Sequence, residues 1–166
     1  MKRPLWILAC ACALPLAVHA ADSPDKSFYK DAAEAGLSEV DDATLAQQKA
    51  TDPKVKDFAA MMIKDHSAAN DKLSALAGSK GITLPTSASV KEMAIHEKLK
   101  LESGDTFDKA YIKGQISAHQ ATLRLLHKEI TSGQDADAQA FAKSVLPTVQ
   151  GHLKAIRGIA TAEGVT

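Results

Sequence analysis

The chain has 166 residues with 20 basic and 20 acidic side chains, so its formal net charge at pH 7 is zero. This balance, with no basic patch or tail, argues against a nucleic-acid partner. Both cysteines, Cys10 and Cys12, lie near the start. Everything after them can therefore form no disulfide and offers no thiolate ligand or thiol nucleophile.

The first twenty residues have the pattern of a secretory signal peptide. Lys2 and Arg3 precede a short, largely apolar run, and small residues lead up to Ala20. The run is short for a membrane span, although a retained membrane anchor is the alternative. We expect residues 1–20 to be the signal peptide and residues 21–166 to be one domain exported to the periplasm, with 18 basic and 20 acidic residues.

The remaining sequence predicts helices. Apolar side chains recur at three- and four-residue steps, and none of the segments alternates for long enough to predict a strand. Thr51-Asp52-Pro53 and Ser132-Gly133-Gln134 are predicted breaks, and Pro147 is expected to kink the last helix. The expected helices cover about residues 27–50, 53–79, 87–101, 106–131 and 135–162.

The lengths of the connections predict how these helices pack. Short turns join the first two long helices and the last two, so each pair should be antiparallel. The middle connection is long and carries the short helix, which allows one crossover along the molecule. We therefore predict an all-α, ferritin-like four-helix bundle whose long crossover contains a short extra helix. Phe58 precedes His66 by eight residues, as Tyr111 precedes His119, which indicates either a duplicated hairpin or a shared packing period.

Four polar residues interrupt the apolar stripes of the long helices. They are Glu39, His66, His119 and His152, one on each helix. Counting from the turns places the first three at one level and His152 roughly 6 Å away from it. Neutral imidazoles are good ligands for zinc, copper or iron, and helical bundles build metal sites from inward side chains. We predict that these four residues form a site for one such transition metal ion.

The same four residues also fit a hydrogen-bond network that binds nothing. Buried polar groups need partners, and Glu39 would accept hydrogen bonds from two of the histidines while Asn70, Gln115 or a water molecule completes the network. Asp65 is expected to orient a neighbour rather than to bind metal. The sequence leaves the metal site and the private network open.

No catalytic motif is present, so we do not predict an enzyme. The residues three positions before the histidines, Ile63, Ile116 and Val149, are not the carboxylates of a di-iron site. There is no nucleophile elbow and no phosphate-binding glycine loop. Storage, buffering or sensing of a metal fits better than turnover.

The alternative function is a non-enzymatic interaction module of the cell envelope with a purely structural polar core. A protein partner would dock on an apolar patch of the short helix. The residues that indicate such a patch are Val90, Met93, Ile95 and Leu99. The sequence does not indicate an oligomeric state.

Several motifs together resemble a bacterial exported family known as domain of unknown function 4142, often labelled as outer-membrane proteins. They are Asp65-His66, Phe107-Asp108 with Tyr111, and Leu146-Pro147 with His152, within matching stretches that cover nearly all of residues 21–166. The resemblance implies a ferritin-like helical fold and export to the periplasm or envelope. It implies no settled activity, substrate or cofactor.

Overall fold

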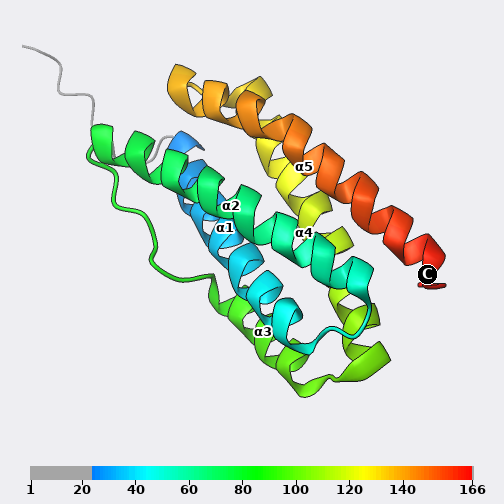
Figure 1. Ribbon diagram of the computed structural model, residues 1–166. Coiled ribbons are helices and arrows are strands. Elements are labelled where there is room, and N and C mark those ends of the chain that lie inside the picture. Colours follow the sequence, from blue (N-terminus) through cyan, green and yellow to red (C-terminus); the bar gives the residue numbers. More distant parts are fainter. Residues whose placement is uncertain (1–23, 166) are drawn as a thin grey trace, which may run out of the picture.

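The computed structural model describes residues 24–165, and in this range it is all-α, with five helices and no strand. The signal peptide expected at residues 1–20 lies outside the described residues. None of the helices in the described range has a stretch long and apolar enough to cross a membrane. Four helices are long and one is short (Figure 1): α1 (Pro24–Lys49), α2 (Pro53–Ser79), α3 (Val90–Leu101), α4 (Gly104–Ser132) and α5 (Ala136–Ala162).

Capping side chains explain where several helices begin. Asp52 accepts a hydrogen bond from the backbone N–H of Lys54, with proline as the first residue of α2. Ser89 and Glu92 form a reciprocal capping box at the start of α3. Asp135 caps α5 by accepting from the N–H of residue 137. The predicted helices agree with these boundaries to within about three residues, and α5 continues without interruption through Pro147.

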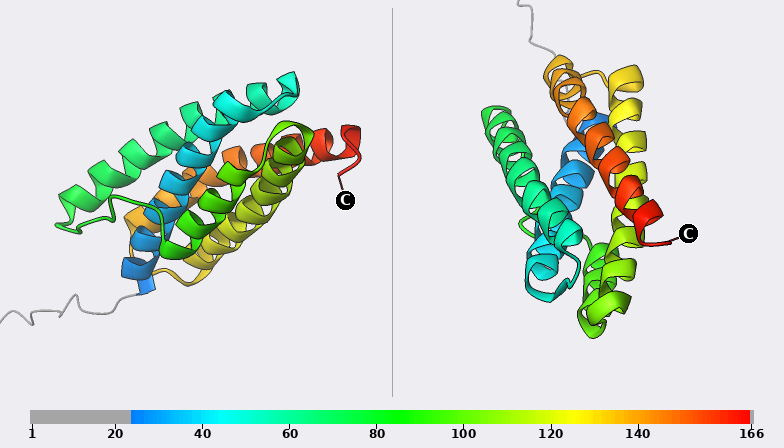
Figure 2. Two further views of the ribbon diagram at one scale, coloured as in Figure 1. Left: turned by 90° about the horizontal axis from the view of Figure 1, so that it is seen from below. Right: turned by 45° about the vertical axis from the view of Figure 1, so that its right-hand side comes forward.

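The long helices pack as two antiparallel hairpins. α1 lies along α2 and α4 lies along α5, while α1 also contacts α4 and α2 also contacts α5. The connection after α2 returns along the molecule, so that α3 lies beside α1 and α4 (Figure 2). As a result, α2 and α4 run in the same direction (Figure 1).

Two buried aspartates join the hairpins in a reciprocal way. Asp108, near the start of α4, accepts hydrogen bonds from the backbone N–H groups of residues 51 and 52 at 2.9–3.1 Å. Asp25, near the start of α1, accepts from the N–H groups of residues 134 and 135 at 2.7 and 3.1 Å. Each hairpin thus begins with a carboxylate that accepts hydrogen bonds from the backbone N–H groups in the turn of the other hairpin.

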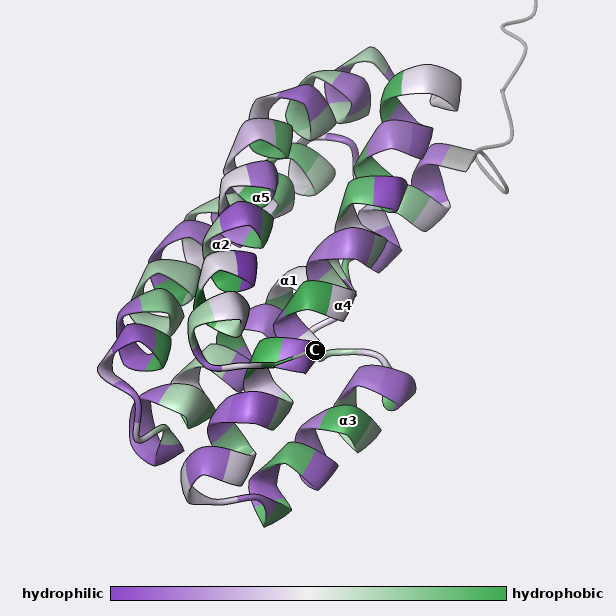
Figure 3. Ribbon diagram, turned by 90° about the vertical axis from the view of Figure 1, so that its right-hand side faces the viewer, coloured by the Kyte–Doolittle hydropathy of each residue, from purple (hydrophilic) through white to green (hydrophobic). Residues whose placement is uncertain are grey.

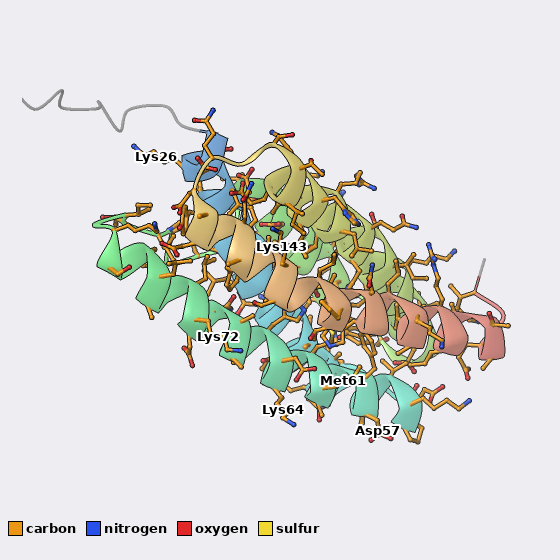
Figure 4. The ribbon with its side chains drawn as sticks, turned by 90° about the horizontal axis from the view of Figure 1, so that it is seen from above. Lys26, Asp57, Met61, Lys64, Lys72 and Lys143 are labelled. Carbon is orange, nitrogen blue, oxygen red and sulfur yellow. The ribbon has the colours of Figure 1, made fainter. Side chains whose placement is uncertain are left out.

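The apolar core is divided into two clusters. One contains Phe58, Met62 and Ile112, and the other contains Phe28 and Leu126. Hydrophobic and hydrophilic residues alternate along every helix (Figure 3), and charged side chains of α2 lie on its outer side (Figure 4). The buried residues Glu39, His66, His119 and His152 lie along their helices between members of the two clusters. The core is therefore interrupted by one polar layer.

Candidate metal centre

Three imidazoles from three helices meet in the polar layer. The ring centroids of His66 (α2), His119 (α4) and His152 (α5) are separated by 5.5–5.8 Å. All three side chains are buried, with 1–8% of their surface exposed. One ring nitrogen from each lies within 4.8 Å of the other two. In the described part of the chain, this is the group of histidine, cysteine and carboxylate side chains whose geometry suits a metal ion.

His119 is oriented by its own helix. Its Nδ1 lies 2.9 Å from the backbone carbonyl oxygen of Gln115, one turn earlier in α4. A carbonyl can only accept, so Nδ1 carries the proton and Nε2 keeps its lone pair. Within residues 24–165, this buried Nε2 has no hydrogen-bond partner. The backbone bond thus fixes the tautomer of the ring and leaves the lone pair of Nε2 available to a metal ion.

His152 is oriented by a carboxylate from another helix. Its Nε2 donates to Oδ2 of Asp65, on α2, at 2.9 Å. Its Nδ1 is buried and lacks a partner among the described residues. A histidine that donates one N–H to a carboxylate while the other nitrogen remains free has the arrangement found behind metal-bound imidazoles. Asp65 therefore orients a neighbour, as the sequence predicts.

His66 connects the centre to the surface. Its Nε2 is buried, and the described residues provide no hydrogen-bond partner for it. The ring also lines a cavity of about 180 Å³ between α2 and α5, whose walls include His152, Ala69 and Thr148. A small ion therefore has a route from solvent to two of the three rings.

The surroundings keep the rings of His66 and His119 neutral. Phe58 packs against His119 and His152 with ring centroids 6.3 Å away from each. Burial lowers the pKa of His66 to about 3, and the two neighbouring imidazoles act in the same direction. Burial also lowers the pKa of His119 to about 4, against the effect of its bond to Gln115. At neutral pH both rings are uncharged, which is the protonation state that binds metal.

Glu39 lies beside this group and not within it. Its Oε1 is 3.5 Å from Nδ1 of His119, the nitrogen that is bonded to the backbone carbonyl of Gln115. Its Oε2 accepts a hydrogen bond from Nε2 of Gln115 at 2.7 Å. Burial raises the pKa of Glu39 to about 8. The structure thus brings together three of the four predicted site residues and places the carboxyl group behind His119.

The distances between the three ring nitrogens require only a small movement of the side chains to bind an ion. An ion equidistant from three atoms that are 4.8 Å apart at most would lie no further than about 2.8 Å from each. Bonds from imidazole nitrogen to zinc are about 2.0–2.1 Å long. The donor atoms would therefore move inward by about 0.7 Å or less, which side-chain rotation can provide.

Sequence reasoning anticipated one neighbour of this centre in part and missed another. Gln115 is one of three candidates to complete a network with Glu39, and in the structure it supplies both the partner of Glu39 and, through its backbone carbonyl, the acceptor for His119. His96, which lies outside the apolar stripe of its helix, is half buried and pairs with Asp42 of α1 at 2.7 Å. That pairing depends on where α3 packs, which the sequence does not reveal.

Solved structures share this fold at low sequence identity. A secreted protein with a domain called DUF305 from Streptomyces coelicolor has a TM-score of 0.75 at 13% identity, covering 89% of this chain and 98% of the other. A DUF305 fragment from Deinococcus radiodurans gives 0.74 at 13% identity, covering 84% and 97%. CopM in its Cu(I)-bound form gives 0.70 at 18% identity, covering 85% and 98%.

Sequence comparison identifies the family. No curated protein matches the chain. The family described as Domain of unknown function (DUF4142) matches residues 12–159, which includes the three histidines and both hairpins. The chain belongs to the DUF4142 family.

Proposed function

We propose that this protein is an exported metal-binding protein that holds one transition metal ion, copper in the first place, between His66, His119 and His152. Two observations carry the proposal: the three imidazoles meet with one ring nitrogen of each within 4.8 Å of the others, and each ring has a buried nitrogen with no hydrogen-bond partner among residues 24–165. Unpartnered buried polar atoms are costly, and a metal ion would satisfy all three at once.

The chemistry of the donor set favours a soft or borderline metal. Neutral imidazoles suit copper, zinc and iron, whereas oxygen donors would suit magnesium or calcium. Structures of the fold relative CopM are described as Cu(I)-bound, Cu(II)-bound and Ag-bound, which supports copper as the first ion to test. Met62 is fully buried in the neighbouring apolar cluster and serves as core packing.

Three further residues would position the ligands. Asp65 holds the ring of His152, the carbonyl of Gln115 holds the ring of His119, and Glu39 lies behind His119. A metal bound by three imidazoles retains an open coordination position. Because no general acid, base or nucleophile is identified beside it, storage, buffering or sensing is the role we propose.

The finer architecture and the location belong to the same proposal. Each hairpin contacts the other through two helix pairs, which supports a ferritin-like four-helix bundle with α3 in the crossover. The charged start and short apolar run of residues 1–20 support export to the periplasm. We treat residues 21–166 as the domain that carries the site.

Metal titration of the full chain tests the proposal. The protein should bind one Cu(I) per chain under reducing conditions. When copper is absent it should bind one Zn(II) per chain, and either ion should raise the melting temperature. His119→Leu should abolish both effects. His127→Leu is the matched control, because His127 is exposed on the same helix. A wild-type protein that binds no first-row metal, or a His119→Leu variant that binds as well as wild type, would refute the proposal.

The short helix supports a second candidate function. Val90, Met93, Ile95 and Leu101 are 43–85% exposed, whereas Leu99 is buried and holds α3 against the core. Large exposed apolar side chains on one short helix favour docking of an envelope protein. Capture of such a partner should survive His119→Leu and be lost in Met93→Ser, so the two candidates are separable. Equal loss in both variants would contradict the docking function.

A further inference from the structure

A groove on the other side of Glu39 is a separate concave site in the described chain. It lies between α1, the start of α3 and the middle of α4, and measures about 670 Å³. A smaller cavity of about 160 Å³ adjoins it beneath α3 and shares Asp42, Ile95 and Gly114 with it. Cavities of this size are typical of sites for small organic molecules. The groove lies outside the three-histidine centre, because none of the three histidines lines either cavity.

The lining of the groove is strongly acidic. Lys91 is the one basic side chain among its described lining residues, and Lys30, nearby on α1, is paired with Glu34. The pKa of Asp42 is raised, chiefly by burial and further by neighbouring carboxylates, although His96 opposes the shift. Carboxyl side chains therefore outnumber basic side chains in the lining of the groove. The acidic lining residues are Asp31, Glu34, Glu39, Asp42 and Glu92.

Buried polar atoms at the floor point to a ligand that donates hydrogen bonds. Oε1 of Gln115, the hydroxyl of Tyr111 and Oε1 of Glu39 have no hydrogen-bond partner within the described range. These side chains are 97–99% buried, since 1–3% of their surface is exposed, and they line the two cavities. The amide Oε1 can only accept. Glu39 keeps its proton at neutral pH in the free protein, and an ammonium group beside it favours the ionised form, in which Oε1 accepts as well. An ammonium group carries three donors and no acceptor, so it matches this floor.

The walls restrict the shape of that ligand. Small residues of α4, including Gly114, Ala118 and Ala121, form one wall, and α1 forms the opposite one. The acidic residues of α1 recur at about one per helical turn, or about every 5.4 Å. A narrow aliphatic chain with ammonium groups at similar intervals fits both the apolar wall and the acidic spacing. A single inorganic ion would leave most of the groove empty.

We propose that this groove binds a linear aliphatic polyamine, with one ammonium group at the floor formed by Glu39, Tyr111 and Gln115 and a second near the acidic residues of α1. The methylene segments lie against the small residues of α4. This binding is independent of the metal proposal, because none of the three imidazoles contributes to it. Glu39 and Gln115 lie between the groove and His119, so the two sites share these two residues but none of the three imidazoles.

Calorimetric titration with spermidine in 150 mM salt and a chelator tests the proposal on the full chain. We expect one spermidine per chain. Gly114→Leu should weaken binding by about tenfold or more without changing charge, because open space surrounds the position of the added Cβ. Asp42→Asn should also weaken it, whereas Asp57→Asn, the same charge change on the outer side of α2 (Figure 4), should not.

Three results would overturn the proposal: the absence of saturable spermidine binding, equal affinity in wild type and Gly114→Leu, or complete displacement by magnesium at matched ionic strength. The last would identify a nonspecific acidic surface. Urea unfolding of each variant establishes that it is folded, and the amide side-chain signal of Gln115 in an NMR spectrum reports the floor directly. Copper titration of Gly114→Leu should match wild type, so failure of one proposal is distinguishable from failure of the other.

Discussion

Removal of the carboxylate behind His152 is the most selective test of the metal centre, because it leaves all three ligands in place. Asp65 holds Nε2 of His152 at 2.9 Å and thereby keeps Nδ1 free. In Asp65→Ala, Nε2–H loses its acceptor and the ring can change tautomer or rotate. The lone pair is then no longer fixed toward the other two histidines.

The expected loss of affinity follows from the exposure of the pair. Carboxylates behind metal-bound histidines contribute roughly 10- to 100-fold to metal affinity. The side chain of Asp65 is 32% exposed, while that of His152 is 3% exposed, so solvent screens the interaction in part. We therefore expect the lower end, about a tenfold weaker affinity, which corresponds to about 1.4 kcal/mol. Asp65→Asn keeps a hydrogen-bond acceptor but not the charge, so its metal affinity should lie between those of wild type and Asp65→Ala.

Competition against a Cu(I) chelator measures this affinity in the folded protein. Asp57→Ala provides the control, since Asp57 is an exposed carboxylate eight residues earlier on the same helix. It removes the same charge but touches none of the three rings. Equal Cu(I) affinities in Asp65→Ala and Asp57→Ala would refute the assignment of Asp65 as a positioning residue. The lost hydrogen bond costs about 1 kcal/mol of folding stability, which unfolding experiments measure separately.

Further predictions concern the carboxyl groups and the cavity. Because the pKa of Glu39 is raised to about 8, Glu39 should contribute about 2 kcal/mol to the loss of unfolding free energy of the metal-free protein between pH 6.5 and 8, and the loss measured by urea unfolding of Glu39→Gln should be smaller by that amount. Asp108→Ala should cost about 2 kcal/mol in the same assay by leaving turn N–H groups unpaired, whereas Asp105→Ala, at an exposed pair, should cost less than about 0.5 kcal/mol. Ala69→Leu should slow metal association in stopped-flow measurements without changing stoichiometry, because Ala69 lines the cavity beside His66. An unchanged pH profile, equal costs or an unchanged rate would contradict the respective prediction.

The sign of the Glu39 prediction depends on which groups titrate in that interval. The folded protein keeps the proton on Glu39 up to about pH 8, whereas the unfolded chain releases it near pH 4.5. Unfolding is therefore increasingly favoured as the pH rises between these values. His66 and His119 act in the opposite direction, because their pKa values are lowered from 6.5 in the folded state, and their effect fades as the pH rises above 6.5. Burial raises the pKa of Glu129 to about 7, so Glu129 acts in the same direction as Glu39 in this interval. The difference between wild type and Glu39→Gln therefore isolates the effect of Glu39.

The helices and the three imidazoles could be predicted because both depend on local periodicity. An apolar stripe at helical spacing places His66 and His119 inward whatever the helices pack against. The level of His152 was harder to predict, since the count from the turns left it roughly 6 Å away. In the structure its ring is 5.5 Å from each of the others. The tilt of the helices and the direction of the side chains remove the expected offset of His152. Counting residues from the turns does not give either quantity.

Contacts between distant segments could not be predicted in the same way. Asp25 and Asp108 each satisfy the turn of the opposite hairpin, and both pairings join residues more than fifty positions apart. Their spacing does carry a repeat, since Asp25 and Asp108 are 83 residues apart, as are the helix caps Asp52 and Asp135. This spacing relates α1–α2 to α4–α5. The predicted similarity of Phe58–His66 to Tyr111–His119 instead relates α2 to α4, which run in the same direction and share a packing period.

The unfolding free energy of the metal-free protein distinguishes a metal site from a hydrogen-bond network that binds nothing. A private network would satisfy its own polar atoms, but each imidazole has one buried nitrogen without a partner in the described chain. Such an atom costs about 1–3 kcal/mol, and leucine is close enough in size to histidine to fill the space. Joint replacement of His66, His119 and His152 by leucine should therefore raise the unfolding free energy of the metal-free protein by a few kcal/mol while abolishing copper binding. A destabilised triple variant would mean that the imidazoles already satisfy one another, and the polar layer would then be structural.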